Sequence, residues 1–180
     1  GTGKSVVAVN LLVELTNRGQ VAQYVSKNAA PRAVYAAKLA GSMRKTRINN
    51  MFRGSGSYVD TDPDTIGTLI VDEAHRLNEK SGLYKNLGDN QVKEIIRAAR
   101  AAVFFIDESQ RVTLDDVGKV AEITKWAREA GACVTLGRLE SQFRCNGSDG
   151  YLAWLDDVLQ VKRTANPDLA GIDYDFRVLS

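Results

Sequence analysis

Short apolar runs alternate with helix-like segments along the chain. Residues 21–25, 69–71, 101–106 and 134–136 are mostly apolar and have the length of β-strands. Within residues 101–106 every position is apolar, as expected of a strand that is covered on both faces of its sheet. These runs predict the strands of a sheet.

Helical periodicity fills the intervals between the runs. Residues 31–39 predict a helix with Pro31 in its first turn, where proline is tolerated. Mostly apolar positions at helical spacing mark further faces: Val92, Ile95, Ile96 and Ala99; Val117, Val120, Ala121, Thr124 and Ala127, ended by Gly131; and Leu152, Leu155, Val158 and Leu159. Residues 162–175 resemble a loop and 176–179 the start of another strand. The alternation predicts an α/β fold, with a mostly parallel sheet flanked by helices and right-handed crossovers.

A further helix is predicted close to the first residue. Residues 6–15 are mostly Val, Ala and Leu, interrupted only by Asn10 and Glu14, and Arg18 and Gly19 supply helix-stop chemistry. A helix that is apolar nearly all round is normally buried. We therefore expect this helix inside the core.

Composition narrows the class only a little. The 180 residues with 44% hydrophobic content can bury a core and fit one domain, and the net charge of +2 is nearly neutral. Cys133 and Cys145 lie far apart and there is one histidine, so we expect no zinc site or disulfide framework but small buried thiols in a reducing compartment. No apolar stretch approaches the roughly 18 residues of a membrane span, so no membrane partner is expected.

The first five residues carry candidate chemistry. Gly1-Thr2-Gly3-Lys4-Ser5 matches the second half of the phosphate-binding P-loop, G-x-x-x-x-G-K-[ST]. In such a loop glycine lets backbone N–H groups approach the phosphates, the lysine neutralises the β- and γ-phosphates, and the hydroxyl binds Mg²⁺. The alternative is a flexible glycine-rich terminus, against which the helix predicted directly after Ser5 argues.

An acidic pair supplies the partner that a P-loop needs. The apolar run 69–71 ends in Asp72 and Glu73. We expect Asp72 to bind Mg²⁺ and Glu73 to act as the base that polarises the attacking water. The two motifs in this order predict nucleotide hydrolysis with ATP and Mg²⁺, and ATP chemistry favours a cytoplasmic location.

The P-loop is incomplete at its start, because its first glycine and the strand that should feed it would precede Gly1. We therefore expect a fold truncated at its first strand, cut from a longer protein. That strand is normally central in the sheet. We expect its loss to leave residues 69–71 and 101–106 with unpaired edges.

Polar residues after the later strands add candidates. Gln110 follows the run 101–106 and can hydrogen-bond both a γ-phosphate and a water, which suits a sensor; an ordinary polar loop is the alternative. Phe143 could stack on adenine, and Arg144 could stabilise charge developing on the γ-phosphate as an arginine finger. His75 is either a residue that couples the site to a neighbouring domain or a surface histidine.

Positive charge is concentrated in residues 27–59. This segment holds seven basic residues and no acidic one: Lys27, Arg32, Lys38, Arg44, Lys45, Arg47 and Arg53. Such a stretch can follow the phosphates of a nucleic acid without reading its bases, or it can be a solvated helix face. For residues 44–53 the two alternatives weigh equally.

The order of the motifs resembles superfamily 1 helicases, and the segments are similar to the bacterial Schlafen group 3-type DNA/RNA helicase domain family. The matching segments are residues 1–5, 24–32, 69–82, 104–107 and 140–155. The resemblance implies a RecA-like P-loop NTPase, with residues 1–160 as a first RecA-like ATPase domain and 161–180 leading towards a second. It also implies a strand-binding loop at Lys27, Asn28 and Arg32.

The sequence thus predicts the ATP-binding and hydrolysing motor domain of a superfamily 1-type helicase or translocase. Its expected partners are single-stranded DNA or RNA and a second RecA-like domain of the same chain. The candidate residues are Glu73, Gln110 and Arg144 for catalysis, and Gly1, Thr2, Gly3, Lys4, Ser5, Asp72 and Phe143 for ATP and Mg²⁺. The alternatives are a P-loop switch or signalling ATPase that moves no nucleic acid, and a binding module with a vestigial nucleotide site.

Overall fold

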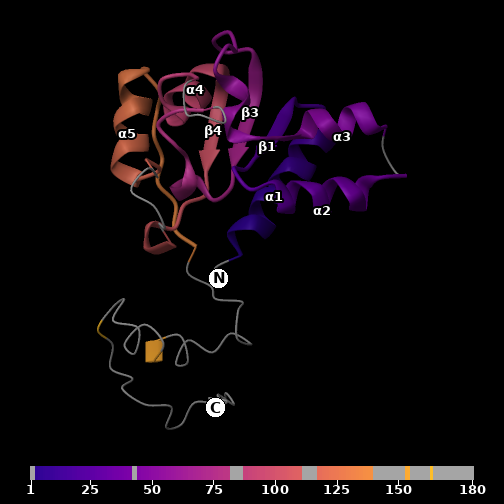
Figure 1. Ribbon diagram of the computed structural model, residues 1–180, viewed down its shortest axis with the longest axis horizontal. Helices are drawn as coiled ribbons and strands as arrows, with labels where there is room; N and C mark the ends of the chain where they lie inside the picture. The colour runs from indigo at the N-terminus through magenta and orange to yellow at the C-terminus, as the bar shows by residue number, and fades with distance from the viewer. Residues whose placement is uncertain are drawn as a thin grey trace. The chain divides into compact units, whose positions relative to one another are not determined.

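The computed structural model describes residues 3–41, 44–81, 87–110, 117–139, 153, 154 and 163. Contacts within the chain divide it into two units, Lys4–Leu136 and a second one formed by Gly1–Gly3 and Gly137–Ser180. Every helix and strand discussed below belongs to the first of these units (Figure 1).

A four-stranded sheet lies at the centre of this unit, with the strand order β2-β1-β3-β4. The strands are β1 (Ala22–Val25), β2 (Phe52–Arg53), β3 (Ile66–Val71) and β4 (Ala99–Phe104), and every pair is parallel. The predicted α/β class with a parallel sheet is confirmed. Because the strands run in one direction, their carboxyl ends share one edge of the sheet.

Helices cover both faces of the sheet (Figure 1). On one face lie α1 (Lys4–Asn17), α2 (Ala29–Leu39) and α3 (Lys45–Met51); on the other lie α4 (Gln91–Ala98) and α5 (Val120–Glu129). Short 3₁₀ helices, Ser55–Tyr58, Ala74–Arg76 and Glu108–Gln110, follow β2, β3 and β4. The helices predicted at residues 31–39 and 92–99 are confirmed, with bounds shifted by a few positions.

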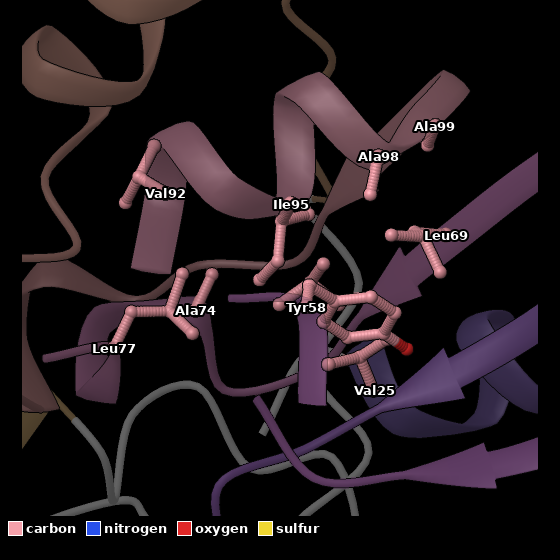
Figure 2. Packing of buried hydrophobic residues seen from close by; sticks show 10 residues of the cluster. Val25, Tyr58, Leu69, Ala74, Leu77, Val92, Ile95, Ala98 and Ala99 are labelled. Carbon is pink, nitrogen blue, oxygen red and sulfur yellow. The ribbon is translucent and has the colours of Figure 1, made fainter. Parts of the chain in front are cut away.

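Side chains of β3 alternate between two cores, as the period of two in a strand requires. Leu69 belongs to the core under α4, which also contains Tyr58, Ile95 and Ala98 (Figure 2). Ile70 belongs to the opposite core with Leu12 of α1. These two β3 residues have no exposed surface, so the end of β3 that leads to the site is enclosed on both faces of the sheet.

The start of α4 is explained by its capping residue. The Asn90 side chain accepts hydrogen bonds from the backbone N–H groups of Val92 (2.9 Å) and Lys93 (3.3 Å). An asparagine at this position satisfies donors that a helix leaves open in its first turn.

Gly131 lies just after the C-terminal end of α5 and has a positive φ of 75°, which confirms its predicted role as a helix stop.

The expectation that α1 is buried all round is wrong. Ala8 and Leu12 are buried, but Val6 is 64% exposed, and Val7 and Val13 are exposed as well. Only one stripe of the helix faces the sheet, so the valines outside that stripe lie at the surface of this unit.

The expected edges of the sheet need a second correction. β3 pairs with β1 on one side and with β4 on the other, so residues 69–71 do not have an unpaired edge. Among the described strands none pairs with the outer edge of β4. β4 is therefore covered less than its apolar sequence predicts: Ala101 is exposed and residues 102–106 are only half-buried.

Three expectations near α5 are also wrong. Residues 134–136 form no strand and Leu136 is 72% exposed, because no described strand lies beside them to complete a ladder. Of the helix face predicted here, Val117 packs against the core just before α5, but Ala121 is exposed, and on α5 itself Ile123 and Trp126 contact the core. Cys133 is exposed rather than buried. The helix expected at 152–159 lies, apart from residues 153 and 154, outside the described residues, as does the strand expected at 176–179.

Gly118 lies where a second backbone segment comes close. A Cβ added to Gly118 would lie 1.7 Å from the carbonyl oxygen of Ala74 and 2.8 Å from the Cα of His75. We expect Gly118→Ala to lower the free energy of unfolding by about 1–3 kcal/mol, because a backbone segment rather than a flexible side chain has to move. Urea denaturation measures this change.

The matched control is Gly137→Ala, since no atom of the described residues lies within 4 Å of a Cβ at that glycine. It should leave the midpoint of the urea transition nearly unchanged. Equal midpoints for Gly118→Ala and the control would contradict the close approach.

Candidate functional site

Polar side chains gather where β1, β3 and β4 end. Lys27 and Asn28 follow β1, Asp72 and Glu73 follow β3, and Asp107 lies shortly after β4. In open α/β sheets, ligands bind outside the carboxyl ends of the strands. The parallel strands therefore bring these segments together at one edge of the sheet.

Lys4, the first residue of α1, also lies at this edge, although it is close to the N-terminal end of the sequence. Its Nζ atom lies 2.9 Å from Oδ2 of Asp107, and the two side chains are 17% and 27% exposed. Gln110 donates to the same carboxylate oxygen through its Nε2 atom at 2.8 Å. Asp107 thus joins Lys4 of the predicted P-loop segment to Gln110, the glutamine that the sequence predicts to be a sensor.

Asp72 is held by hydrogen bonds to both of its carboxylate oxygens. The Tyr24 hydroxyl donates to Oδ2 at 2.6 Å, and the backbone N–H of Glu73 donates to Oδ1 at 3.0 Å. Asp72 is 4% exposed and Tyr24 is fully buried. Burial raises the pKa of the Tyr24 phenol, and the hydrogen bond and negative charge of Asp72 raise it further. Tyr24 therefore remains a proton donor to Asp72 through the neutral range.

Glu73 has a left-handed backbone, with φ 55° and ψ 40°. Its side chain remains 31% exposed, and Oε2 lies 3.5 Å from Nε2 of His75. His75 is buried, at 1% exposed, and its Nδ1 atom has no hydrogen-bond partner among the described residues. The alternative of a surface histidine is therefore wrong. His75 therefore lies beside the Glu73 carboxylate, and that carboxylate still has access to solvent.

The loop after β1 is attached to the segment that follows the acidic pair. Lys27 Nζ donates to Oδ1 of Asn78 at 2.9 Å, and Arg76 Nη1 lies 3.5 Å from Oδ1 of Asn28. The Nε–H of Arg32 donates to the backbone oxygen of Asn28 at 3.2 Å. The three predicted strand-binding residues thus lie together, next to residues 76–78.

Asn78 is itself fixed from the core side. Its backbone N–H donates to Oε1 of Gln91 at 2.9 Å, and Gln91 Nε2 donates to the Ser81 hydroxyl at 2.9 Å. Gln91 and Ser81 are both buried. A buried polar chain therefore holds the residue to which Lys27 is bound.

Four predicted site residues, Gly1, Thr2, Phe143 and Arg144, lie outside the described residues. Gly3 has a positive φ of 74°, a conformation that glycine adopts without strain. Ser5 lies in the first turn of α1 and is half-buried. In the part of the chain that the structure describes, no helix is long and apolar enough to cross a membrane.

The family to which these motifs belong is decided by comparison. A family model described as Schlafen group 3, DNA/RNA helicase domain matches residues 1–180. The chain belongs to this family. The expected resemblance is confirmed over the whole sequence, and it supports a nucleotide-hydrolysing function related to nucleic acid. Comparisons with curated proteins and with solved structures found no match.

Three residues of this Schlafen group 3 domain contact the predicted site residues, although the sequence analysis did not name them as candidates. Asp107 follows a buried strand, as Asp72 does, and that position was its available signal. Tyr24 and Asn78 carry no comparable signal, because a tyrosine in a strand normally indicates core packing and an asparagine after a turn normally indicates a loop.

Tyr24→Phe tests the hydrogen bond to Asp72. We expect the free energy of unfolding at neutral pH to fall by about 1.5–3 kcal/mol, because a buried carboxylate loses one of its donors while the ring is kept. Urea denaturation of the wild type and the variant gives this difference. An unchanged stability would show that Tyr24 does not hold Asp72.

The same variant should change the dependence of stability on alkaline pH. Because the folded-state pKa of Tyr24 is raised above its ordinary value of 10.0, its contribution is fully present below that pH and is lost as pH rises further. The wild type should therefore lose stability above pH 10.0, and Tyr24→Phe should lose it less steeply. Burial also raises the pKa of Tyr58, which leaves a residual slope in the variant. Identical slopes would contradict the assignment.

Proposed function

We propose that this chain is the ATP-hydrolysing motor domain of a superfamily 1-type DNA or RNA helicase or translocase, with a RecA-like fold. One observation carries the proposal: Lys4 Nζ lies 2.9 Å from Asp107 Oδ2 although 103 positions separate the two residues. The lysine of the P-loop segment is thereby placed at the sheet edge from which Asp72 and Glu73 emerge. Family membership supports the link to nucleic acid.

The side chains at this edge fit ATP and Mg²⁺ as cofactors. Mg²⁺ prefers oxygen ligands and usually keeps several waters beside one or two protein carboxylates and substrate phosphates. Asp72 offers a buried carboxylate and Ser5 a hydroxyl for the ion, and Lys4 offers a positive charge for the phosphates.

Each residue has a defined task in the proposed hydrolysis. Bound ATP supplies the γ-phosphoryl group that is transferred to water. Lys4 exchanges the carboxylate of Asp107 for phosphate oxygens, so its charge is balanced in both states. Glu73, beside His75 and partly exposed, takes the proton of the attacking water. Gln110 orients that water or senses the γ-phosphate.

Single-stranded nucleic acid is proposed to bind at the loop after β1, through Lys27, Asn28 and Arg32. The contacts to Asn78 and Arg76 connect this loop to the segment that begins with Glu73. A rearrangement of that segment during hydrolysis is therefore passed directly to the strand-binding loop.

We also propose roles for four residues outside the described part of the chain, and bounds for the domains of the motor. Phe143 stacks on adenine and Arg144 stabilises the charge that develops on the γ-phosphate. Residues 1–160 form the first RecA-like domain, and 161–180 connect it to a second one that closes over the nucleotide in the cytoplasm. Gly1 and Thr2 complete the phosphate loop.

Glu73→Gln and Lys4→Ala separate hydrolysis from binding. In the intact protein we expect Glu73→Gln to retain ATP affinity but to lower turnover by about 10²–10⁴-fold, because the amide keeps the shape and loses the base. Lys4→Ala should weaken ATP binding itself, since the phosphates lose their counter-charge. Equilibrium titration with a fluorescent ATP analogue and a phosphate-release assay measure the two effects.

The control is Glu79→Gln, which changes an exposed carboxylate a short distance beyond the acidic pair. Wild-type turnover in Glu73→Gln would overturn the assignment of the base. If ATP is hydrolysed but single strands never stimulate the rate, the protein is a P-loop switch rather than a motor.

Lys27→Ala and Arg32→Ala test the strand-binding loop. Each variant should bind single-stranded DNA or RNA more weakly, and the slope of log affinity against log salt should become shallower by about 1 for each lost phosphate contact. Fluorescence anisotropy over a salt series measures both quantities.

Arg128→Ala is the control for charge, because Arg128 is exposed on α5, on the other face of the sheet. It should change the affinity and the slope little. Wild-type affinity and slope in both loop variants would mean that the basic segment is only a solvated surface.

A further inference from the structure

A hollow of about 250 Å³ lies between α2 and α3, beside the strand-binding loop. Its apolar lining comes from Ala33, Ala36, Ile48 and Phe52, and its polar lining from Arg32 and Asn49. We propose that this hollow receives one base of a single-stranded nucleic acid. This inference rests on the proposed function and adds a base-binding subsite to the phosphate contacts of Lys27 and Arg32.

The floor of the hollow is apolar and firmly supported. Ile48 and Phe52 are buried, and the Phe52 ring stacks on Tyr35 with centroids 5.9 Å apart and planes at 23°. Tyr24 contacts Phe52 from another side, with centroids 5.8 Å apart. Aromatic and aliphatic surfaces of this kind stabilise unstacked bases, and they do so with little regard to sequence.

The rim of the hollow provides polar groups of two kinds. Arg32 is anchored by its bond to the Asn28 carbonyl, and its guanidinium lies alongside Gly54, 3.5 Å from where a Cβ would stand. Asn49 is exposed on α3, and its amide offers both a donor and an acceptor to the edge of a base. A phosphate at Arg32 therefore places the attached nucleotide at the mouth of the hollow.

Charge favours a nucleic acid over an acidic peptide as the occupant. All residues that line the hollow come from the segment 27–59, which contains seven basic side chains and no acidic one, and Arg32 is part of the lining itself. This segment therefore suits a chain of phosphates. An acidic peptide would meet the same charge but has no regularly spaced flat rings for an apolar hollow. A nucleic acid strand satisfies both properties at once.

The test compares an oligonucleotide that carries bases with an abasic strand of equal length, in the intact protein. Wild-type affinity for the strand with bases should exceed that for the abasic strand by about five- to tenfold, because only the former fills the hollow. Ala33→Leu, which fills the hollow, and Asn49→Ala, which removes its amide, should reduce this ratio. Affinity for the abasic strand should stay at its wild-type value. Fluorescence anisotropy at fixed salt measures each affinity.

The chain offers a matched control for each variant. Ala37 and Asn50 are exposed residues of the same types on the same two helices, and neither lines the hollow. Ala37→Leu and Asn50→Ala should therefore keep the wild-type ratio. Urea denaturation of all four variants shows whether they are folded.

The outcomes separate this inference from the function on which it rests. Equal wild-type affinity for the two strands would overturn the base-binding hollow and leave the phosphate contacts intact. Equal weakening of both strands in Ala33→Leu would also overturn it, because the hollow would then hold backbone. Failure of the wild type to bind any single strand would overturn the proposed function itself.

Discussion

The hydrogen-bond ladder on both sides of β3 is the constraint on which the rest of the structure depends. It continues beyond the last residue of β3: the N–H of Asp72 donates to Val25 O at 2.9 Å, and the N–H of Ala74 donates to Phe105 O at 2.9 Å. The acidic pair is thus bracketed by backbone bonds to both neighbouring strands. Segments that are far apart in sequence meet at one edge because these strands are parallel and in register.

The same bracketing explains how Glu73 keeps a left-handed backbone. A non-glycine residue in this conformation costs on the order of 1–3 kcal/mol and persists only where the surroundings fix it. Asp72 and Ala74, the residues on either side, are each held by a backbone hydrogen bond, and Oδ1 of Asp72 accepts the N–H of Glu73 itself. The left-handed conformation changes the direction of the chain at Glu73, and the Glu73 side chain remains accessible while His75 is buried.

An aromatic cluster connects Asp72, at the carboxyl edge of the sheet, to the surface between α2 and α3. Tyr24 packs its ring against Tyr35 and Phe52, and its hydroxyl binds Asp72. Phe52 is in turn the floor of the hollow that we propose for a base. One buried tyrosine therefore contacts both halves of the candidate site, and it fixes the position of one relative to the other through a packed, hydrogen-bonded path.

The sequence by itself determined the features whose causes are local or carried by a motif. Burial on both faces requires unbroken apolar residues, so residues 69–71 of β3 could be predicted. Lys4, Asp72 and Glu73 were recognisable as candidates from short motifs, and Gln110 from its place after an apolar run. Only the tertiary structure decided the roles of Tyr24 and Asp107, because the partner of Tyr24 lies 48 positions away and that of Asp107 lies 103 away. The exposure of Val6 and Val13 was settled in the same way, since it depends on which segments pack beside α1. Periodicity reports which side of an element is apolar, whereas burial and hydrogen bonding depend on neighbours that local sequence does not specify.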